Sequence, residues 1–237
     1  MLGWGLRKQQ WQSLGPAPLC LGGPLQPSGA KRARPCSRGC HDGDVKPSGT
    51  VRALSQALDE QQLVTIKRAI RRSDKLGGYV VGIGRQWALM ELFNGDLFLN
   101  GYSAVRLDDV IGIAKVRPGL QRRALELFGE WPPSRPTGEL SLDGTRELLI
   151  SAGALFPLLT LFDERVDPEA CYIGAVVNVT QRSVRLLEVT PNASWEATVK
   201  AYGLAKLTRV DFAGRYERAL WGLAGPPPDG AVTVSIP

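Results

Sequence analysis

The chain has 237 residues, 43% of them hydrophobic, which is enough to bury the core of one large domain or of two small ones. Its formal net charge is +6, but residues 1–50 alone hold seven Lys or Arg against two Asp. Residues 51–237 hold 22 basic and 21 acidic side chains, so net charge gives them no general affinity for a polyanion.

Cysteine usage and hydropathy favour a cytoplasmic protein. Cys20, Cys36 and Cys40 lie among the first 50 residues, and Cys171 is the only cysteine after them, so no disulfide framework can support the rest of the chain. The N-terminus lacks an apolar run followed by a small-residue cleavage site, and the chain has no run of about 18 apolar residues. We therefore expect a soluble, cytoplasmic protein with no membrane partner.

Residues 1–50 are interpreted as a disordered basic tail. They are rich in Gly, Pro, Ser and Arg and follow neither the strand nor the helix period. The abrupt change of composition after them leaves two readings open: a natural flexible tail, or upstream sequence read in frame, with Val45 or Val51 at an alternative start. Cys36, Cys40 and His41 offer zinc-ligating atoms, but their spacing does not suit a compact finger and no apolar core surrounds them, so we expect no metal.

From residue 59, short apolar runs separated by turn residues are typical of an all-β chain. Strands are predicted over 62–71, 77–84, 87–93, 96–106 and 109–114, followed by a helix over 119–129. Asn94-Gly95 predicts a tight hairpin turn, because both residues tolerate the positive φ of a type I′ turn. Gly82 and Gly84 predict a bulge or sharp bend in the second strand.

The second half of the chain repeats this plan. After a linker over 131–142 we expect a helix over 143–153, then strands over 157–163, 171–179, 182–190, 194–202 and 206–211, a helix over 214–224 and a tail over 226–237. Similar segments recur at offsets of 93 to 100 residues, such as Arg123-Ala124-Leu125 with Arg218-Ala219-Leu220, Tyr79 with Tyr172, and Val110 with Val210. This self-similarity predicts one duplicated domain, with repeats over 59–130 and 143–225.

These segments resemble a known fold. Five short strands with a bent, glycine-containing second strand and flanking helices are similar to the Sm-like, or SH3-like, small β-barrel. More closely, Gly78–Gly84 with Trp87, Arg106–Val110, Cys171–Gly174 and Thr208–Phe212 resemble an uncharacterised bacterial family. The resemblance implies a mainly β chain of two tandem five-stranded barrels with short flanking helices, and it implies no activity. The RNA-contacting loop motifs of Sm-like proteins have no equivalent in this sequence.

Catalytic constellations are missing from residues 51–237. His41 is the only histidine, so Ser-His-Asp and Cys-His catalysis are excluded there. Asp108-Asp109 is interpreted as a solvated turn between strands, and Gly82-Ile83-Gly84 precedes a strand instead of the helix that a phosphate-binding loop requires. We predict no enzymatic activity, no cofactor and no metal.

The most basic stretch after the tail comprises Lys67, Arg68, Arg71, Arg72 and Lys75. One reading is a solvated edge strand, whose Lys and Arg discourage aggregation, and the other is a set of nucleic-acid contacts. The near-neutral charge of residues 51–237 favours a non-enzymatic binding or scaffold protein that presents loops or a strand edge to a protein partner. The alternative is an Sm-like protein that binds RNA or another single-stranded nucleic acid through these five residues.

Overall fold

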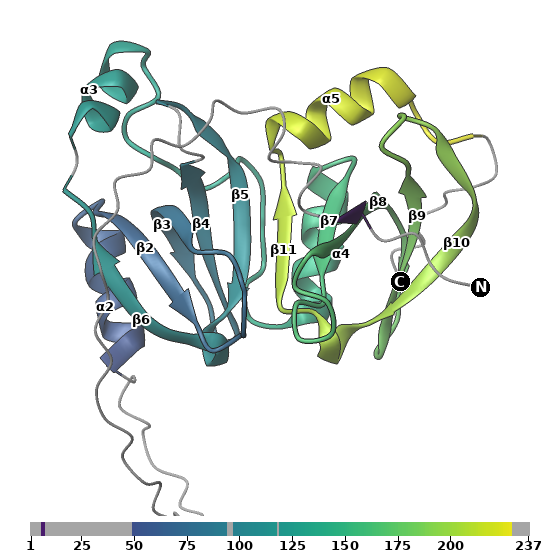
Figure 1. Ribbon diagram of the computed structural model, residues 1–237, viewed down its shortest axis with the longest axis horizontal. Helices are drawn as coiled ribbons and strands as arrows, with labels where there is room; N and C mark the ends of the chain where they lie inside the picture. The colour runs from purple at the N-terminus through teal and green to yellow at the C-terminus, as the bar shows by residue number, and fades with distance from the viewer. Residues whose placement is uncertain (1–5, 8–48, 94–96, 118, 229–237) are drawn as a thin grey trace, which may run out of the picture.

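The computed structural model describes residues 6–7, 49–93, 97–117 and 119–228, and it is a mainly β protein (Figure 1). Ten strands form one continuous antiparallel sheet, and a two-residue strand, β1 (Leu6–Arg7), pairs with β8 beside Ala170 and Cys171. Among the described residues, no helix combines the length and the apolar character that a membrane span requires.

The first half of the chain begins with a helix and ends with one. Two of its strands are joined by a short 3-10 helix, η1. The elements in order are α2 (Gly49–Asp59), β2 (Leu63–Arg68), β3 (Leu76–Ile83), β4 (Trp87–Phe93), β5 (Leu99–Arg106), η1 (Leu107–Asp109), β6 (Val110–Lys115) and α3 (Leu120–Leu127).

The second half has the same succession of elements, including a 3-10 helix, η2, before its last strand. The elements in order are α4 (Thr145–Leu155), β7 (Leu159–Phe162), β8 (Ala170–Val179), β9 (Ser183–Val189), β10 (Trp195–Gly203), η2 (Leu204–Lys206), β11 (Arg209–Phe212) and α5 (Arg215–Ala224).

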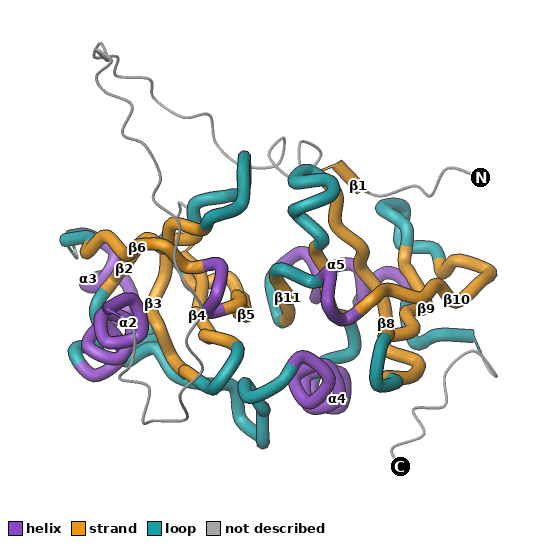
Figure 2. The backbone as a smooth tube through the Cα atoms, turned by 90° about the horizontal axis from the view of Figure 1, so that it is seen from below, coloured by secondary structure: helices purple, strands orange, loops and turns teal. Residues whose placement is uncertain are grey.

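Strand order is the same in the two halves. The sheet runs β10-β9-β8-β7-β11-β5-β4-β3-β2-β6, so in each half the last strand pairs with the first, and the others follow in chain order. The halves are joined where β11 pairs with β5, with Arg209 opposite Val105 and Phe212 opposite Tyr102. Viewed from below, β5 and β11 lie between the other strands of the two halves (Figure 2). The outermost strands of the sheet are consequently β6 and β10.

The main hydrophobic core extends through both halves. Alternate side chains of the joined strands point into it, among them Ala104 of β5 and Val210 and Phe212 of β11, all fully buried. Helix α4 adds Leu148 and Leu149 to the same core. Each buried Leu or Phe side chain stabilises the fold by roughly 1.5–3 kcal/mol. The join is therefore part of the core and not a surface contact between separate bodies.

A second core lies under α2. Leu54 and Ala57 of this helix pack against Val64 and Ile66 of β2. The sequence predicts no helix over residues 49–58 and places residues 1–50 in a disordered tail. The predicted tail is too long by residues 49–50, which begin α2; Leu6–Arg7 form β1, and residues 1–5 and 8–48 lie outside the described part of the chain.

One glycine in each half allows neighbouring strands to approach closely. A Cβ atom on Gly78 of β3 would lie 2.2 Å from the carbonyl oxygen of Glu91, and one on Gly174 of β8 would lie 2.2 Å from that of Leu187. Since no side chain fits at either place, both positions require glycine. The two glycines occupy the same position in the second strand of their respective halves.

The predicted strands match the observed ones to within a few residues, and the bulge expected around Gly82 is present as a register shift between Val80 and Gly82. The Asn94-Gly95 turn lies outside the described residues. In the segment 131–142, expected as a linker, Leu140 and Leu142 are buried, and the Leu142 carbonyl accepts a hydrogen bond from Trp87 N at 3.0 Å.

The interpretation of Lys67 and its neighbours as an edge strand is wrong. Strand β2 is an inner strand, because it pairs with β3 on one side and with β6 on the other. The sequence predicts two tandem barrels, and what the structure establishes is the continuous sheet that contains both halves.

Candidate functional site

The five basic residues predicted as a site separate in the structure. Arg68, at the end of β2, is only 4% exposed, whereas Lys67 and Lys75 lie on the surface. Arg71 and Arg72 are exposed in the turn that follows β2, and Arg72 has a left-handed backbone with φ 60°. The turn lies at the junction of the two halves, so we take that junction as the candidate functional site.

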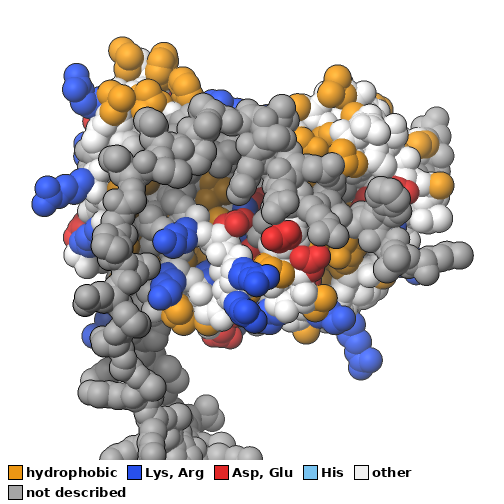
Figure 3. All heavy atoms as spheres, viewed as in Figure 1, with side chains coloured by type: hydrophobic (Ala, Val, Ile, Leu, Met, Phe, Trp, Pro, Cys, Tyr) orange, Lys and Arg blue, Asp and Glu red, His pale blue; other side chains and the backbone are white. Residues whose placement is uncertain are grey.

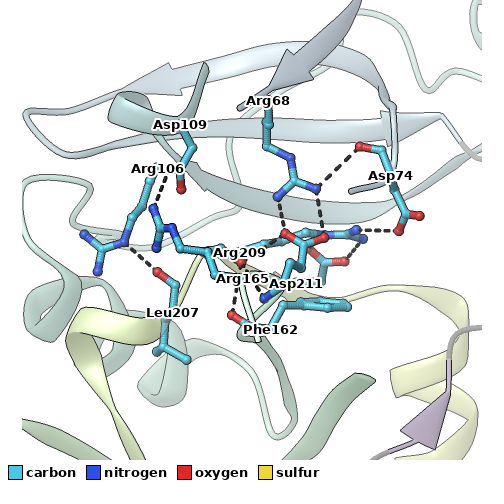
Figure 4. Close-up of polar contacts among 11 residues, drawn as sticks. Arg68, Asp74, Arg106, Asp109, Phe162, Arg165, Leu207, Arg209 and Asp211 are labelled. Atoms are coloured by element: carbon cyan, nitrogen blue, oxygen red, sulfur yellow. Dashed lines mark hydrogen bonds and ion pairs between the residues drawn. The ribbon is translucent and has the colours of Figure 1, made fainter. Parts of the chain in front are cut away.

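Arg68 is held in the junction by Glu164, which follows β7 in the second half. Figure 4 shows Arg68 with Asp74, Arg209 and Asp211 around it. The Arg68 guanidinium donates to both oxygens of the Glu164 carboxylate, with Nη2 2.9 Å from Oε1 and Nη1 in contact with Oε2. Both side chains are fully buried. The hydroxyl of Thr208 also donates to Glu164, at 3.0 Å. Because its charge is neutralised inside the protein, Arg68 is not available to a nucleic acid.

A second buried ion pair lies beside the first. Arg209 of β11 donates to Asp211 through Nε at 2.7 Å and through Nη2, and its Nη1 lies 3.1 Å from Asp74. Its guanidinium carbon lies 4.3 Å from the ring centroid of Phe162. Burial acts to lower the pKa of Arg209, but the charge and hydrogen bonds of Asp211, together with the charges of Glu164 and Asp74, outweigh burial and raise it. Asp74, in the first half, is thereby tied to the second half.

Asp109 was predicted in a solvated turn, and this prediction is wrong. It is 6% exposed at the end of η1, where its Oδ1 accepts a hydrogen bond from Arg165 of the loop after β7. Its second oxygen, Oδ2, is buried and has no hydrogen-bond partner among the described residues. The side chain of Arg165 is 46% exposed. Asp108 is exposed, as expected.

Arg106, at the end of β5, fixes the first half to backbone of the second. Its Nε donates to the carbonyl of Leu207 at 2.5 Å and its Nη2 to that of Leu204 at 2.8 Å. The guanidinium lies 4.9 Å from the ring centroid of Trp87. Burial lowers the pKa of Arg106, and the nearby charge of Arg165 lowers it further. These contacts hold η2 against the end of β5.

A hollow of about 520 Å³ opens at this junction. Its lining includes Arg71 and Arg72 from the first half, Glu164 and Arg165 from the second, Asp109, and the apolar residues Ala69, Ile70 and Pro168. Figure 3 shows acidic and basic side chains gathered near the middle of the face that is seen in Figure 1. No group of three or more His, Cys, Asp or Glu that could hold a metal occurs within the described ranges.

Of the predicted residues, the structure brings only Arg71 and Arg72 to the hollow; Arg68 lies in the ion pair with Glu164, and Lys67 and Lys75 do not line it. Sequence reasoning missed Glu164, Arg165 and Arg209. The one available signal was the alternation in Arg209-Val-Asp211-Phe, which places two opposite charges on one face of a strand.

The outer edges of the sheet are a second candidate surface. In the described part of the chain, no strand pairs with the outer side of β6 or of β10. Ile111 of β6 is 54% exposed and Val199 of β10 is 39% exposed. Ala114 and Ala201 are exposed on the same two strands. Unpaired backbone groups beside apolar side chains are suited to pairing with another strand.

Comparison of this chain with protein-family models, with curated proteins and with solved structures found no match.

Proposed function

We propose that this chain is a cytoplasmic, non-enzymatic scaffold that binds protein partners by adding their strands to β6 and β10. The observation that carries the proposal is that the ten-stranded sheet ends in two strands whose outer sides are unpaired among the described residues. Strand addition supplies affinity through main-chain hydrogen bonds. The partner that these edges fit best is a second copy of the same chain.

The halves are, in this proposal, duplicated small barrels of the Sm-like or SH3-like kind. Their identical strand order and the equivalent glycines, Gly78 and Gly174, support the duplication. The join within the chain then pairs the fourth strand of one repeat, β5, with the fifth strand of the other, β11. The edges left over are a fifth strand, β6, and a fourth strand, β10. A second copy can therefore repeat the same join between molecules.

Equivalent positions in the fifth strands follow from the register. Val64 lies opposite Gly78, as Leu159 lies opposite Gly174. In turn, Lys115 of β6 lies opposite Val64, as Phe212 of β11 lies opposite Leu159. Lys115 is thus the equivalent of Phe212.

Equivalent positions in the fourth strands follow from the 3-10 helices. Arg106 ends β5 just before η1, and Gly203 ends β10 just before η2, so Tyr102 corresponds to Val199. Because Phe212 lies opposite Tyr102, the join between two molecules places Lys115 opposite Val199. One residue back along β6, it places Ala114 opposite Lys200.

The register makes the proposal testable with charges. Lys115 and Lys200 are already balanced inside the chain, the first by Glu60 at 3.1 Å and the second by Glu188 at 3.0 Å. In Val199→Lys the new charge faces Lys115, and in Ala114→Lys it faces Lys200; like charges directly opposite in a sheet are destabilising. Val199→Glu and Ala114→Glu place opposite charges at the same points.

Sedimentation velocity of the full chain over a range of concentrations is the test. We expect the wild type and the two Glu variants to form species larger than a dimer, because a head-to-tail contact leaves one edge free at each end. Both Lys variants should be monomeric, whereas Leu223→Lys, on the exposed side of α5, should behave as the wild type. A wild type that stays monomeric at every concentration contradicts self-association.

Mixing the two Lys variants tests the polarity of the contact. The Ala114→Lys chain keeps an intact β10 and the Val199→Lys chain an intact β6, so the mixture should form a one-to-one dimer that grows no further. A mixture that stays monomeric, or a wild type that stops at a dimer, contradicts head-to-tail pairing.

The alternative proposal, binding of RNA or single-stranded nucleic acid, has less support. Of its five predicted contacts, Arg68 is buried in an ion pair with Glu164. The remaining residues provide few of the phosphate contacts on which polyanion binding depends.

A further inference from the structure

We infer that the hollow at the junction of the two halves binds a small phosphate monoester of the size of a mononucleotide. Strand addition at β6 and β10 makes no use of this hollow, so the inference is independent of the proposed scaffold function. Its volume of about 520 Å³ lies within the range of sites for small molecules, roughly 300–1,000 Å³.

The charges of the hollow leave it positive. Glu164 is neutralised by Arg68 and Asp109 by Arg165. Arg71 and Arg72 also line the hollow, and within the described part of the chain neither makes an ion pair. Guanidinium groups are suited to the paired hydrogen bonds that a phosphate accepts. Arg72 is moreover held in the left-handed region, φ 60°, a conformation that is uncommon outside glycine and clusters at functional sites.

The other end of the ligand is indicated by Asp109. Its Oδ2 atom is buried without a partner, which leaves an acceptor that favours a hydrogen-bond donor. Arg165 contacts the other oxygen of Asp109, so a donor at Oδ2 leaves the ion pair between Asp109 and Arg165 in place. The exocyclic amine or ring N–H of a nucleobase is such a donor, since carboxylates accept from base edges.

The apolar part of the lining suits a flat ring. Ile70, Ala69 and Pro168 contribute apolar surface to the hollow. A ligand with a phosphate, a flat ring and a donor on that ring can therefore pair with Arg71 and Arg72, cover the apolar surface and donate a hydrogen bond to Asp109 Oδ2. Inorganic phosphate can do only the first of these.

Isothermal titration of the full chain with AMP, CMP, GMP and inorganic phosphate tests this inference. At least one mononucleotide should bind at least tenfold more tightly than inorganic phosphate. The double variant Arg71→Ala/Arg72→Ala should lose at least tenfold in affinity, and Asp109→Asn should reduce the preference for the mononucleotide over phosphate. Arg85→Ala, which removes an arginine that is 83% exposed outside the hollow, is the matched control and should bind normally.

Circular dichroism and the sedimentation profile of each variant separate lost binding from lost folding or lost assembly. Absence of mononucleotide binding by the folded wild type, or equal affinity for phosphate and for all three mononucleotides, overturns the inference. So does binding of single-stranded RNA that is far tighter than that of any mononucleotide and equally dependent on Arg71 and Arg72, because the surface would then recognise a polymer.

Discussion

Arg68 and Glu164 stand 96 residues apart in the sequence, yet they form an ion pair with two hydrogen bonds and no solvent exposure of either side chain. Arg68 ends β2, the first strand of its half, and Glu164 lies two residues after β7, the first strand of the other half. Thr208 also donates to Glu164, and Arg68 Nη2 also donates to the carbonyl of Asp74 at 3.4 Å, so each charge has a second partner.

Removal of one partner should destabilise the whole fold. Arg68→Ala leaves a buried carboxylate without its counter-charge, and we expect it to lower the free energy of unfolding by about 3–5 kcal/mol. Urea unfolding at neutral pH measures the change. The double variant Arg68→Met/Glu164→Met should recover most of the loss, because it leaves no buried charge; a double variant as unstable as the single one would show that the pair matters through its shape.

The two close-contact glycines should be equally intolerant of a side chain. Gly78→Ala and Gly174→Ala each push a methyl group into a neighbouring strand, and each should lower the free energy of unfolding by about 1–3 kcal/mol or more. Gly222→Ala is the control: its Cβ meets no atom within 4 Å, and alanine should stabilise helix α5 by roughly 0.5–1 kcal/mol. Thermal unfolding of the three variants checks this, and a harmless Gly174→Ala would argue against the equivalence of the two halves.

Glu91 should make stability fall as pH rises. Burial raises its pKa to about 7, although hydrogen bonds from Ser134 N and the Tyr102 hydroxyl oppose the shift. Below the ordinary pKa of 4.5, both the folded and the unfolded states hold the proton. Between about 4.5 and 7 only the folded state favours the protonated carboxyl, so the free energy of unfolding falls as pH rises. Above about pH 7 this contribution no longer changes with pH.

The variant Glu91→Gln isolates this contribution. Relative to the wild type, it should gain stability between pH 5 and pH 8, as measured by the urea midpoint. Glu139→Gln, which removes an exposed carboxylate that does not act on Glu91, should show no such gain. If the difference between wild type and Glu91→Gln is the same at both pH values, Glu91 does not titrate in this range.

Much of the fold could be predicted because it depends on local patterns. Short apolar runs such as Leu63–Arg68 and Trp87–Phe93 mark strands, and turn residues mark their ends, so the predicted strand bounds agree with the structure to within a few residues. Helix α2 was missed because it begins inside a segment with the composition of the tail. Its apolar positions, Leu54 and Ala57, do follow the helical period.

The site could not be predicted in the same way, because it is made by long-range contacts. Asp109 and Glu164 both stand beside turns, where carboxylates are usually solvated, and nothing local indicates that each will meet an arginine of the other half. Strand pairing between β5 and β11 creates this neighbourhood. A sequence expected to form two separate barrels therefore gave no reason to expect a polar junction between them.

Hydrogen–deuterium exchange of the full chain, followed by mass spectrometry at low and at high protein concentration, tests the scaffold proposal most directly. Peptides that cover 110–115 and 195–203 should exchange more slowly at high concentration, because their outer backbone groups become paired between molecules, while 99–106 and 209–212, already paired within the chain, should not change. Exchange at both outer strands that is independent of concentration would contradict the account.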